Sequence, residues 1–385
     1  MDQSQRQHVL SFLADQREEM EAFLERLVNI DSNSRDPDGV RRVADAIAEF
    51  FKARGIDAGT LDTVDAPCVS ARIGPRSNSG HVLLLGHMDT VFPTGEVARR
   101  PFRKENGRGY GPGVADMKAG LVMNAFVMAA FQETGGAPVP IVALFTADEE
   151  IGTPRCRDAI EAHARGARLV LNSEPGRISG NVVSGRRGGA FFRVTVTGKA
   201  AHSGLNPEDG RSAIGEMARK IIAWHDLKND EREISVNVGL VEGGQSVNTV
   251  APGCVADIDL RFTDHAEGER ASADIKQIAE RCAEGLTGAI ETLGAFLPVV
   301  QTEHSRKVID MYLDGARSLG LDIADEFTRS CADSGLTASV GAPTVCAVGP
   351  VGAHAHSPEE FVELDSFVPR AQAAALAVLA SAADS

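Results

Sequence analysis

Five short motifs of this 385-residue chain carry imidazole or carboxylate side chains. They are GHMD (86–89), GVAD (113–116), TADEE (146–150), NSE (172–174) and AHAH (353–356). Together they offer histidines and several carboxylates, and none of them contains a cysteine. Imidazole and carboxylate donors without thiolates suit one or two zinc ions, or a similar borderline metal. These residue types therefore predict metal-assisted chemistry.

Four of the motifs follow apolar runs that have the length of buried strands. The runs are Val82–Leu85, Ile141–Phe145, Leu169–Leu171 and Thr344–Val348, the last joined to its motif by a glycine-rich loop. In open α/β sheets, ligands bind beyond the carboxyl ends of the strands. A single acidic loop or His-x-Asp pair is usually a solvated surface feature. The repeated occurrence of such residues at strand ends predicts that they form one shared site.

Helical patterns at Arg41–Arg54 and Gly120–Gln132 alternate with these strands. The alternation predicts an α/β fold with a mostly parallel sheet and helices on both of its faces. From about residue 184 the strands instead alternate apolar and polar residues, at 191–196, 234–240, 256–262 and 289–296, with helices at 211–227 and 267–286. This βαββαβ order predicts an α/β sandwich with a sheet covered on one face only.

After about residue 299 the first pattern returns, with helices at Ser305–Leu319 and Ser366–Ala382. We therefore predict a discontinuous catalytic domain at 1–183 and 299–385, and an inserted lid domain at 184–298.

Composition restricts the class of protein. The formal net charge is -15, which argues against nucleic acid or an anionic membrane as the main partner. We find no signal-peptide pattern and no apolar stretch of the roughly 20 residues that a membrane span needs. The six cysteines form no C-x-x-C pair, so neither a thiolate zinc site nor a disulfide framework is indicated. We expect a reduced, cytoplasmic protein.

The motifs GHMDTV, GPGVADMKAG, FTADEEIG, NSEPG and AHAHSPEE, in this order, resemble the metal-site motifs of the zinc-dependent aminoacylase and carboxypeptidase family. The resemblance runs from about residue 20 to the C-terminus and is strongest to bacterial glutamate carboxypeptidase. It implies a di-zinc catalytic domain, two Zn²⁺ per subunit that Co²⁺ or Mn²⁺ could replace, and an inserted domain that forms a homodimer.

The resemblance also implies a role for each motif residue. Asp116 would bridge the two metals, His87 and Glu174 would complete one of them, and Glu150 and His356 the other. Asp89 would orient the imidazole of His87, since side chains two residues apart share a strand face. Glu149 would be the general base for a water that bridges the metals. Relatives often have a cis peptide after the bridging aspartate, here Asp116-Met117.

Two local alternatives concern the motif residues. His354 competes with His356 as the last ligand, and spacing alone does not choose between them; the resemblance favours His356, which directly precedes SPEE. The glycines of GRGYGPG could suggest a dinucleotide loop, but the preceding strand and the downstream acidic residue of that fingerprint are missing. We interpret them as a loop that lets the backbone approach closely before Asp116.

In the inserted domain, the resemblance implies that His202 of GKAAHSG stabilises the tetrahedral oxyanion in the other subunit, and that Asn248 helps to bind substrate there. From sequence alone, His202 is an exposed loop histidine. Arg261 of DIDLRF is either a surface ion pair or a planar clamp for a substrate carboxylate. Arg186 and Arg187 are weaker candidates that we expect to be solvated or hinge residues.

The predicted reaction is hydrolysis of an amide that releases a C-terminal amino acid, glutamate or a similar residue first, from a small substrate with a free carboxylate. An N-acyl-amino-acid deacylase with the same metal site is the alternative. Relatives often have Gly-Gly-Ser/Thr-Asp before the last strand, whereas this chain has SCADSG with Asp333 in the place of the aspartate. A binding protein that kept only the fold should have lost a ligand or the base, and all of them are present.

Overall fold

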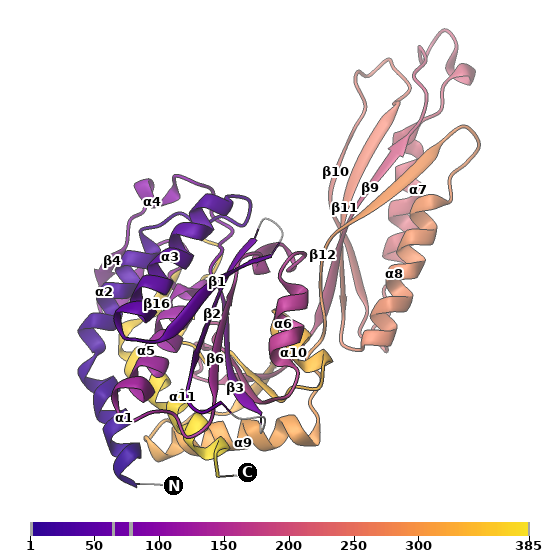
Figure 1. Ribbon diagram of the computed structural model, residues 1–385. Helices are drawn as coiled ribbons and strands as arrows, with labels where there is room; N and C mark the ends of the chain where they lie inside the picture. The colour runs from indigo at the N-terminus through magenta and orange to yellow at the C-terminus, as the bar shows by residue number, and fades with distance from the viewer. Residues whose placement is uncertain (1–2, 64–65, 77–79, 384–385) are drawn as a thin grey trace. The chain divides into compact units, whose positions relative to one another are not determined.

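The computed structural model describes residues 3–63, 66–76 and 80–383, which form two compact units (Figure 1). The first unit comprises Met1–Gly185, Gln301–Thr328 and Leu336–Ser385, and the second comprises Arg186–Val300 and Arg329–Gly335. The division lies close to the predicted boundaries at 184 and 298. It differs in one segment, because Arg329–Gly335 groups with the second unit rather than with the catalytic domain.

An eight-stranded sheet forms the centre of the described part of the first unit, in the order β1-β2-β6-β3-β7-β14-β8-β13. The strands are β1 (Asp57–Thr63), β2 (Ala66–Ile73), β3 (His81–His87), β6 (Ile141–Thr146), β7 (Ala167–Asn172), β8 (Val182–Arg186), β13 (Asp325–Thr328) and β14 (Thr344–Cys346). The four strands β6, β3, β7 and β14 are mutually parallel, while β2 and β8 join them in antiparallel orientation. The predicted α/β class with a mostly parallel catalytic sheet is confirmed.

Helices cover both faces of this sheet, with α3 on one side and α6 on the other (Figure 1). The helices of the first unit are α1 (Gln3–Asp15), α2 (Arg17–Val28), α3 (Pro37–Ala53), α4 (Glu96–Arg99), α5 (Ala119–Glu133), α6 (Arg157–Ala164), α9 (Glu303–Ser318), α10 (Ser334–Ser339) and α11 (Phe367–Ser381). Short turns of helix are η1 (Val114–Lys118), η2 (Glu149–Ile151) and η4 (Leu364–Ser366).

Helix α3 begins with a capped first turn. The carboxylate of Asp36 accepts a hydrogen bond from the Gly39 backbone N–H at 3.0 Å and another from the Thr94 hydroxyl at 2.9 Å. The bond from Gly39 satisfies an N–H that the helix leaves unpaired, and Pro37 fits the first helical position, where no N–H is needed. The hydrogen bond from Gly39 is the main reason that the pKa of Asp36 is lowered.

We expect Asp36→Ala to lower the free energy of unfolding by about 1 kcal/mol, and Asp36→Asn to lower it much less. Because the folded state lowers the pKa of Asp36, its contribution is present above the ordinary aspartate pKa and is lost as the pH falls through the lowered one. Urea unfolding of the three proteins at neutral and acidic pH measures both effects. An equal loss in the two variants would contradict a capping role.

The stretch Val114–Glu133 corrects the expectation that no segment could span a membrane. Its length and apolar composition are sufficient for a span, but 94% of its apolar window is buried inside the protein. Helix α5 is buried along nearly its whole length, as expected for a helix enclosed by other elements on every side. The apolar stretch is therefore explained as a core helix of the first unit.

A second sheet of the first unit was not predicted. It has the order β15-β16-β5-β4, with strands β4 (Arg103–Glu105), β5 (Arg108–Tyr110), β15 (Gly352–Ala353) and β16 (Phe361–Glu363). Two or three residues are too few to give a readable alternation of apolar and polar side chains. This sheet brings the loop before Asp116 beside the chain that follows His356, because β16 pairs with β5.

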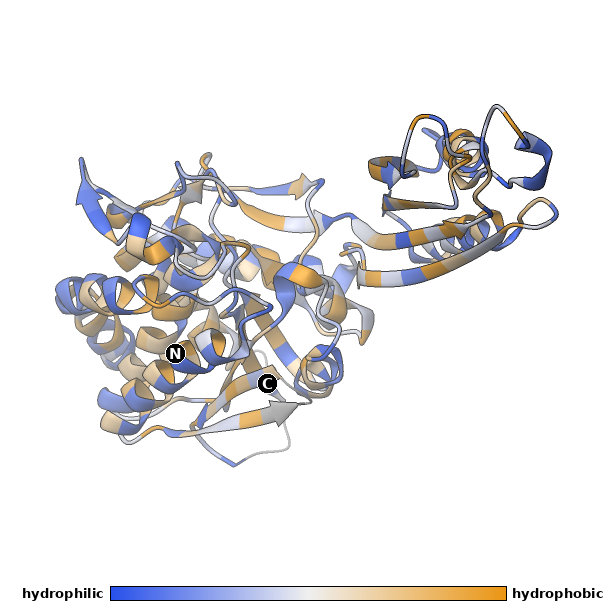
Figure 2. Cartoon of the chain, turned by 90° about the horizontal axis from the view of Figure 1, so that it is seen from above, coloured by the Kyte–Doolittle hydropathy of each residue, from blue (hydrophilic) through white to orange (hydrophobic). Residues whose placement is uncertain are grey.

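The second unit has the predicted βαββαβ order. It consists of β9 (Gly188–Thr197), the short η3 (Pro207–Asp209), α7 (Ala213–His225), β10 (Ser235–Gly243), β11 (Gly253–Phe262), α8 (His265–Glu280) and β12 (Thr287–Phe296). The strands form an antiparallel sheet in the order β10-β11-β9-β12. Burial alternates along β11, and apolar and polar residues alternate along the strands in Figure 2, as expected for a sheet covered on one face.

Helix α8 ends at Glu280, before the predicted end at Leu286. The buried ammonium of Lys220 on α7 donates to the carbonyl oxygens of Ile278 and Arg281, at 2.6 and 2.7 Å. A lysine from a neighbouring helix thus satisfies carbonyl groups that the end of α8 leaves unpaired. The residues that follow turn toward β12, an effect that local sequence does not reveal.

Candidate active site

The carboxyl ends of the parallel strands meet at one edge of the large sheet. His87 is in register with Thr146 across β3 and β6, and Asn172 is in register with Leu85 and with Cys346. The acidic residues that follow β6 and β7 therefore emerge beside His87. This arrangement is the physical reason that motifs far apart in sequence form one cluster.

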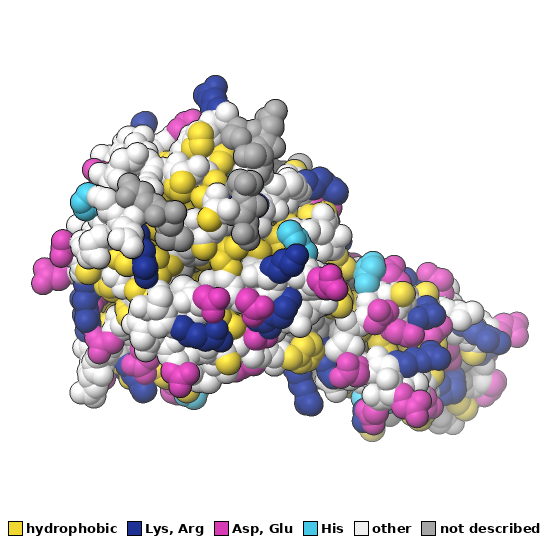
Figure 3. Space-filling view, turned by 90° about the horizontal axis from the view of Figure 1, so that it is seen from below, with side chains coloured by type: hydrophobic (Ala, Val, Ile, Leu, Met, Phe, Trp, Pro, Cys, Tyr) yellow, Lys and Arg dark blue, Asp and Glu magenta, His cyan; other side chains and the backbone are white. Residues whose placement is uncertain are grey.

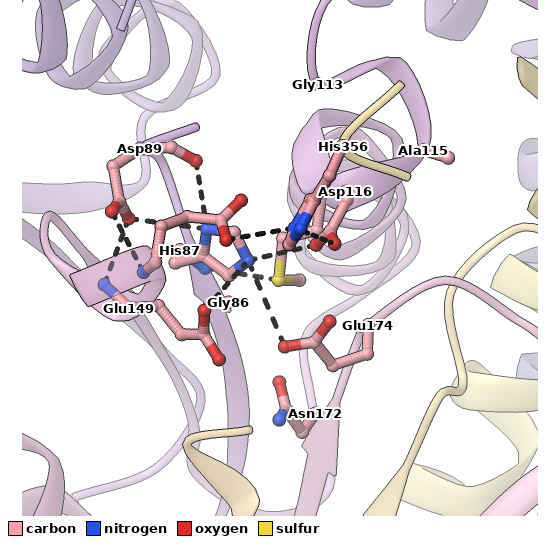
Figure 4. A network of polar contacts seen from close by, with 12 residues as sticks. Gly86, His87, Asp89, Gly113, Ala115, Asp116, Glu149, Asn172, Glu174 and His356 are labelled. Atoms are coloured by element: carbon pink, nitrogen blue, oxygen red, sulfur yellow. Dashed lines mark hydrogen bonds and ion pairs between the residues drawn. The ribbon is translucent and has the colours of Figure 1, made fainter. Parts of the chain in front are cut away.

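The carboxylate of Asp116 contacts both histidines, which are drawn with it in Figure 4. Its Oδ1 is 3.2 Å from His87 Nε2, and its Oδ2 is 3.4 Å from His356 Nε2. The Nε2 atom of His356 is also 3.1 Å from Glu150 Oε2. On the other side, His87 Nε2 is 3.9 Å from carboxylate oxygens of Glu149 and of Glu174. The other predicted ligands and the predicted base therefore lie around Asp116 and His87.

This donor set fits a metal centre. Ligand atoms of His87, Asp116 and Glu150 lie within 4.8 Å of one another. Glu150 Oε1 is buried and has no hydrogen-bond partner within the described chain, which leaves a desolvated acceptor on a residue of the cluster. Four carboxylates gathered around two imidazoles repel one another unless cations balance them. Oxygen and nitrogen donors of this kind suit zinc and similar divalent ions.

The carboxylates of the cluster stabilise positive charge beside them, on the histidines or on a bound cation. Burial alone would raise the pKa of Asp116, but its hydrogen bonds to His356 and His87 outweigh burial and lower it. The hydrogen bond to Asp116, and then that to Glu150, raises the pKa of His356 to about 10. Burial and the charge of Asp116 raise the pKa of Glu150. Bound metal ions would take the place of the imidazolium protons, since a histidine ligand must be neutral.

Asp89 is fully buried and organises the residues beside it. The Nδ1 atom of His87 is 3.0 Å from the Asp89 carbonyl oxygen and 3.3 Å from its carboxylate. The Asp89 carboxylate also accepts the backbone N–H groups of Glu149 and Glu150, each at 3.1 Å, and the hydroxyl of Ser34 at 2.5 Å. Asp89 therefore orients the His87 ring and also fixes the loop that carries the predicted base.

Glu360 also belongs to this site, although its sequence context did not predict this. It has no solvent exposure, and its carboxylate accepts the backbone N–H groups of Gly113 at 3.0 Å, Ala115 at 2.8 Å and Asp116 at 2.9 Å. Burial raises the pKa of Glu360 to about 7, although these hydrogen bonds oppose the increase. The only sequence signal was its place as the last residue of AHAHSPEE.

The loop before Asp116 is closely packed, as predicted from its glycines. Gly113 has φ +69, and a Cβ atom there would lie 2.4 Å from Thr90 Cγ2, so a larger residue would displace the loop. The Asp116-Met117 peptide bond is cis, as expected from the resemblance. Of the two candidate histidines, His356 contacts the cluster, whereas the His354 ring lies beside Phe361, 5.8 Å between ring centres.

In the second unit, His202 and Asn248 lie on paired segments. His202 forms an antiparallel bridge with Thr249, and the Ser203 N–H donates to the Asn248 carbonyl oxygen at 3.0 Å. His202 is exposed, and its Nδ1 accepts the backbone N–H groups of Gly204 and Leu205, both at 3.2 Å. A ring that accepts at Nδ1 carries its proton on Nε2, which makes this atom a hydrogen-bond donor to a ligand.

Arg261 forms the ion pair that the simpler interpretation predicted. Its Nε is 2.7 Å from Asp259 Oδ1, its Nη1 donates to the Cys331 sulfur at 2.7 Å, and its guanidinium lies 5.1 Å from the centre of the Phe191 ring. Arg186 is not solvated, because it is buried and donates to the Ser330 hydroxyl and to the Cys331 carbonyl oxygen. These contacts tie the segment Arg329–Gly335 to the second unit. The alternative, that Arg186 is a hinge residue, stays a prediction.

Comparison with known proteins identifies the family. Residues 83–380 match peptidase family M20/M25/M40. The chain belongs to this family. Its members are metal-dependent peptidases and amidohydrolases, so this protein is a hydrolase of that class and the cluster around Asp116 is its candidate metal site.

Similar proteins cover most of the chain. It is 28% identical over 359 residues to carboxypeptidase G2 of Pseudomonas sp. (strain RS-16), which corresponds to 90% of this chain and 85% of that protein. It is 28% identical over 311 residues to succinyl-diaminopimelate desuccinylase of Stenotrophomonas maltophilia, or 74% and 79% of the two chains. The M20 family metallo-carboxypeptidase Sso-CP2 of Sulfolobus solfataricus has the same fold, with a TM-score of 0.80, 20% identity and coverage of 95% and 99%.

Proposed function

We propose that this M20 family hydrolase is a cytoplasmic, di-zinc carboxypeptidase that releases glutamate or a similar C-terminal amino acid from a small amide substrate. The observation that carries the proposal is the carboxylate of Asp116, whose two oxygens face the Nε2 atoms of His87 and His356 at 3.2 and 3.4 Å. That arrangement suits a carboxylate that bridges two ions. His87 and Glu174 would hold one zinc, and Glu150 and His356 the other.

Glu149 is the proposed general base. Zinc ions at this site would polarise the scissile carbonyl and lower the pKa of the attacking water. The Glu149 side chain is 9% exposed and reaches within 3.9 Å of His87 Nε2. Its backbone N–H donates to the Asp89 carboxylate, which fixes the backbone from which this side chain extends. Glu149 would take the proton as water attacks and return it to the leaving amine.

His202 and Arg261 are the proposed contributions of the second unit. The Nε2–H group of His202 would donate to the tetrahedral oxyanion in the active site of the other subunit, where a preorganised donor is worth several kcal/mol in the transition state. Asn248, on the paired segment, would contact the substrate beside it. Since Nε and Nη1 of Arg261 already contact Asp259 and Cys331, we assign the substrate carboxylate to its third nitrogen, Nη2.

We further propose a homodimer formed through the second unit. Strand β10 is at an edge of its sheet, and Leu240 and Val241 on it are 67% and 59% exposed. Ile214 on α7 is 45% exposed and lies 3.2 Å from where a Cβ atom of Gly244 would be, so the apolar surface continues onto the helix. An exposed apolar edge strand is a surface that proteins normally cover.

The homodimer predicts the effect of charge on this strand. We expect Leu240→Lys combined with Val241→Lys to convert the protein to a monomer at micromolar concentration, because the substitutions place positive charges of both subunits at the proposed interface. Light scattering after size-exclusion chromatography measures the molar mass. As a control, lysine would replace Ile178 of the first unit, which is also exposed, at 61%. A wild-type protein that is already monomeric would overturn the proposed homodimer.

The nature of the substrate is proposed from charge and from the relatives. Acidic and basic side chains are interspersed on the face shown in Figure 3, and the chain carries a formal net charge of -15. The negative net charge favours a small molecule over nucleic acid or an anionic membrane as the ligand. We propose a free carboxylate on that molecule because the guanidinium of Arg261 is its proposed partner. Carboxypeptidase G2 matches more of the chain than the desuccinylase does, which favours selection of the C-terminal side of the amide.

Amine release from a panel of N-acyl amino acids and dipeptides tests this selection. The panel varies the acyl group and the C-terminal residue independently, with zinc-loaded protein and a chelator-treated control. We expect metal-dependent rates to follow the C-terminal residue, with glutamate among the best. Rates that follow the acyl group would instead identify an N-acyl-amino-acid deacylase.

A further inference from the structure

Two buried cysteines of the first unit are in direct contact. The sulfur atoms of Cys68 on β2 and Cys156 are 3.1 Å apart, although 88 positions separate them in sequence. Both side chains have no solvent exposure. Neither residue contributes to the cluster around Asp116, and the spacing of the cysteines in sequence gave no reason to pair them. The contact is therefore a feature that the hydrolytic mechanism leaves unexplained.

We propose that Cys68 and Cys156 are a redox-active pair that forms a reversible disulfide when the folded protein is exposed to a peroxide. A disulfide requires the sulfur atoms to approach to about 2.05 Å, so the two side chains need to move by roughly 1 Å in total. Oxidation begins when one thiolate attacks a peroxide oxygen and gives a sulfenic acid, with one water released. The second thiol attacks that sulfur, the S–S bond forms, and a second water leaves. The two thiols are oxidised and one hydrogen peroxide is reduced to two waters.

Because of the position of Cys156, a disulfide would act on the loop that carries the proposed base. Cys156 is the residue before helix α6 and ends the segment that begins after β6 and carries Asp148, Glu149 and Glu150. The Asp148 carboxylate accepts the Arg155 N–H at 2.7 Å and also interacts with the Cys156 thiol. A disulfide would link the end of this segment covalently to β2. In the sheet, β2 and β3 are the two neighbours of β6. We infer that the disulfide would restrict the movement of the loop that carries the proposed base.

Burial determines how fast the pair reacts. The hydrogen bond with Cys68, followed by burial and the charge of Asp148, holds the pKa of Cys156 well above its ordinary value. Since the thiolate is the reactive form, oxidation in the folded protein should be slow and should speed up at alkaline pH. A small oxidant such as hydrogen peroxide suits a pair without solvent exposure better than a bulky disulfide does.

Mass spectrometry of the intact, folded protein tests the proposal without reference to activity. Purified protein is incubated with hydrogen peroxide, remaining thiols are alkylated under denaturing conditions, and the digest is analysed without reductant. We expect one linked pair of peptides, containing Cys68 and Cys156, that reductant separates. Cys254 and Cys346, which are also buried but belong to other parts of the fold, serve as internal controls and should be alkylated.

The thermal unfolding midpoint gives a second readout. Closing a loop of this length should raise it by roughly 5 °C in the oxidised protein, and Cys68→Ala should abolish the peroxide-dependent rise. Full alkylation of Cys68 and Cys156 after peroxide treatment, or conversion of either one to a sulfinic acid without a linked peptide, would overturn the proposal. Because neither readout depends on hydrolysis, failure here would leave the proposed function unaffected.

Discussion

Glu149→Ala is expected to retain bound metal and to lower kcat by at least two orders of magnitude. General base catalysis typically contributes a factor of about 10² to 10⁴. The other carboxylates at the cluster are proposed metal ligands or, like Asp89 and Glu360, accept backbone N–H groups. Glu149 lies 3.9 Å from His87 Nε2 but is held in place through its backbone by Asp89. Removal of its side chain should therefore leave the metal ligands in position. Steady-state kinetics together with metal analysis of the dialysed protein measures both effects.

The adjacent residue provides the matched control. Glu150 contacts His356 at 3.1 Å, and its other oxygen is buried without a partner in the described chain, so Glu150→Ala should reduce the metal content as well as turnover. The two variants are thus expected to separate loss of catalysis from loss of metal. Near-normal turnover in Glu149→Ala would show that another residue is the base, and equal loss of metal in both variants would assign Glu149 to the ligand set.

Glu360→Ala is expected to weaken zinc binding by about 10- to 100-fold, which is the usual effect of removing a group that supports metal ligands. The variant leaves the N–H groups of Gly113, Ala115 and Asp116 without their buried acceptor, and the loop that presents Asp116 should then lose its fixed position. Turnover should fall at limiting zinc and recover in part at high zinc. Calorimetric zinc titration and activity at graded zinc concentrations measure this.

Glu359→Ala is the control for Glu360, because Glu359 is the preceding residue and is exposed. It should bind zinc as the wild type does. Glu360→Gln keeps the size of the side chain and one oxygen acceptor, so its zinc affinity should lie between those of the wild type and of Glu360→Ala. If Glu360→Ala lowers the unfolding midpoint but leaves zinc affinity unchanged, Glu360 stabilises the fold and does not position Asp116.

The large sheet and the cluster were predictable because they depend on short apolar runs followed by reactive side chains. Parallel strands must end at one edge, so residues that follow them must lie close together, whatever their separation in sequence. His87 and the residues after β6 meet in this way through the register of His87 with Thr146. The order of elements in the second unit was predictable for a similar reason, since a sheet with one exposed face imposes alternation.

The features that could not be predicted depend on contacts between distant segments. Lys220 binds the last carbonyl groups of α8, where the helix ends. Arg186 binds the segment Arg329–Gly335, which therefore belongs to the second unit and not to the predicted catalytic domain. Glu360 acts through backbone N–H groups that the sequence does not mark in any way. The strands of the second sheet of the first unit are too short to show periodicity.

The most direct test of the account is a zinc titration of the metal-free enzyme. Protein stripped with a chelator is given increasing equivalents of zinc, and amide hydrolysis is measured beside zinc binding for the wild type and for Asp116→Ala. We predict that stripped protein is inactive, that activity reaches its maximum as the second equivalent binds, and that Asp116→Ala stays inactive at every ratio. Full hydrolysis by metal-free protein, or by Asp116→Ala, would contradict it.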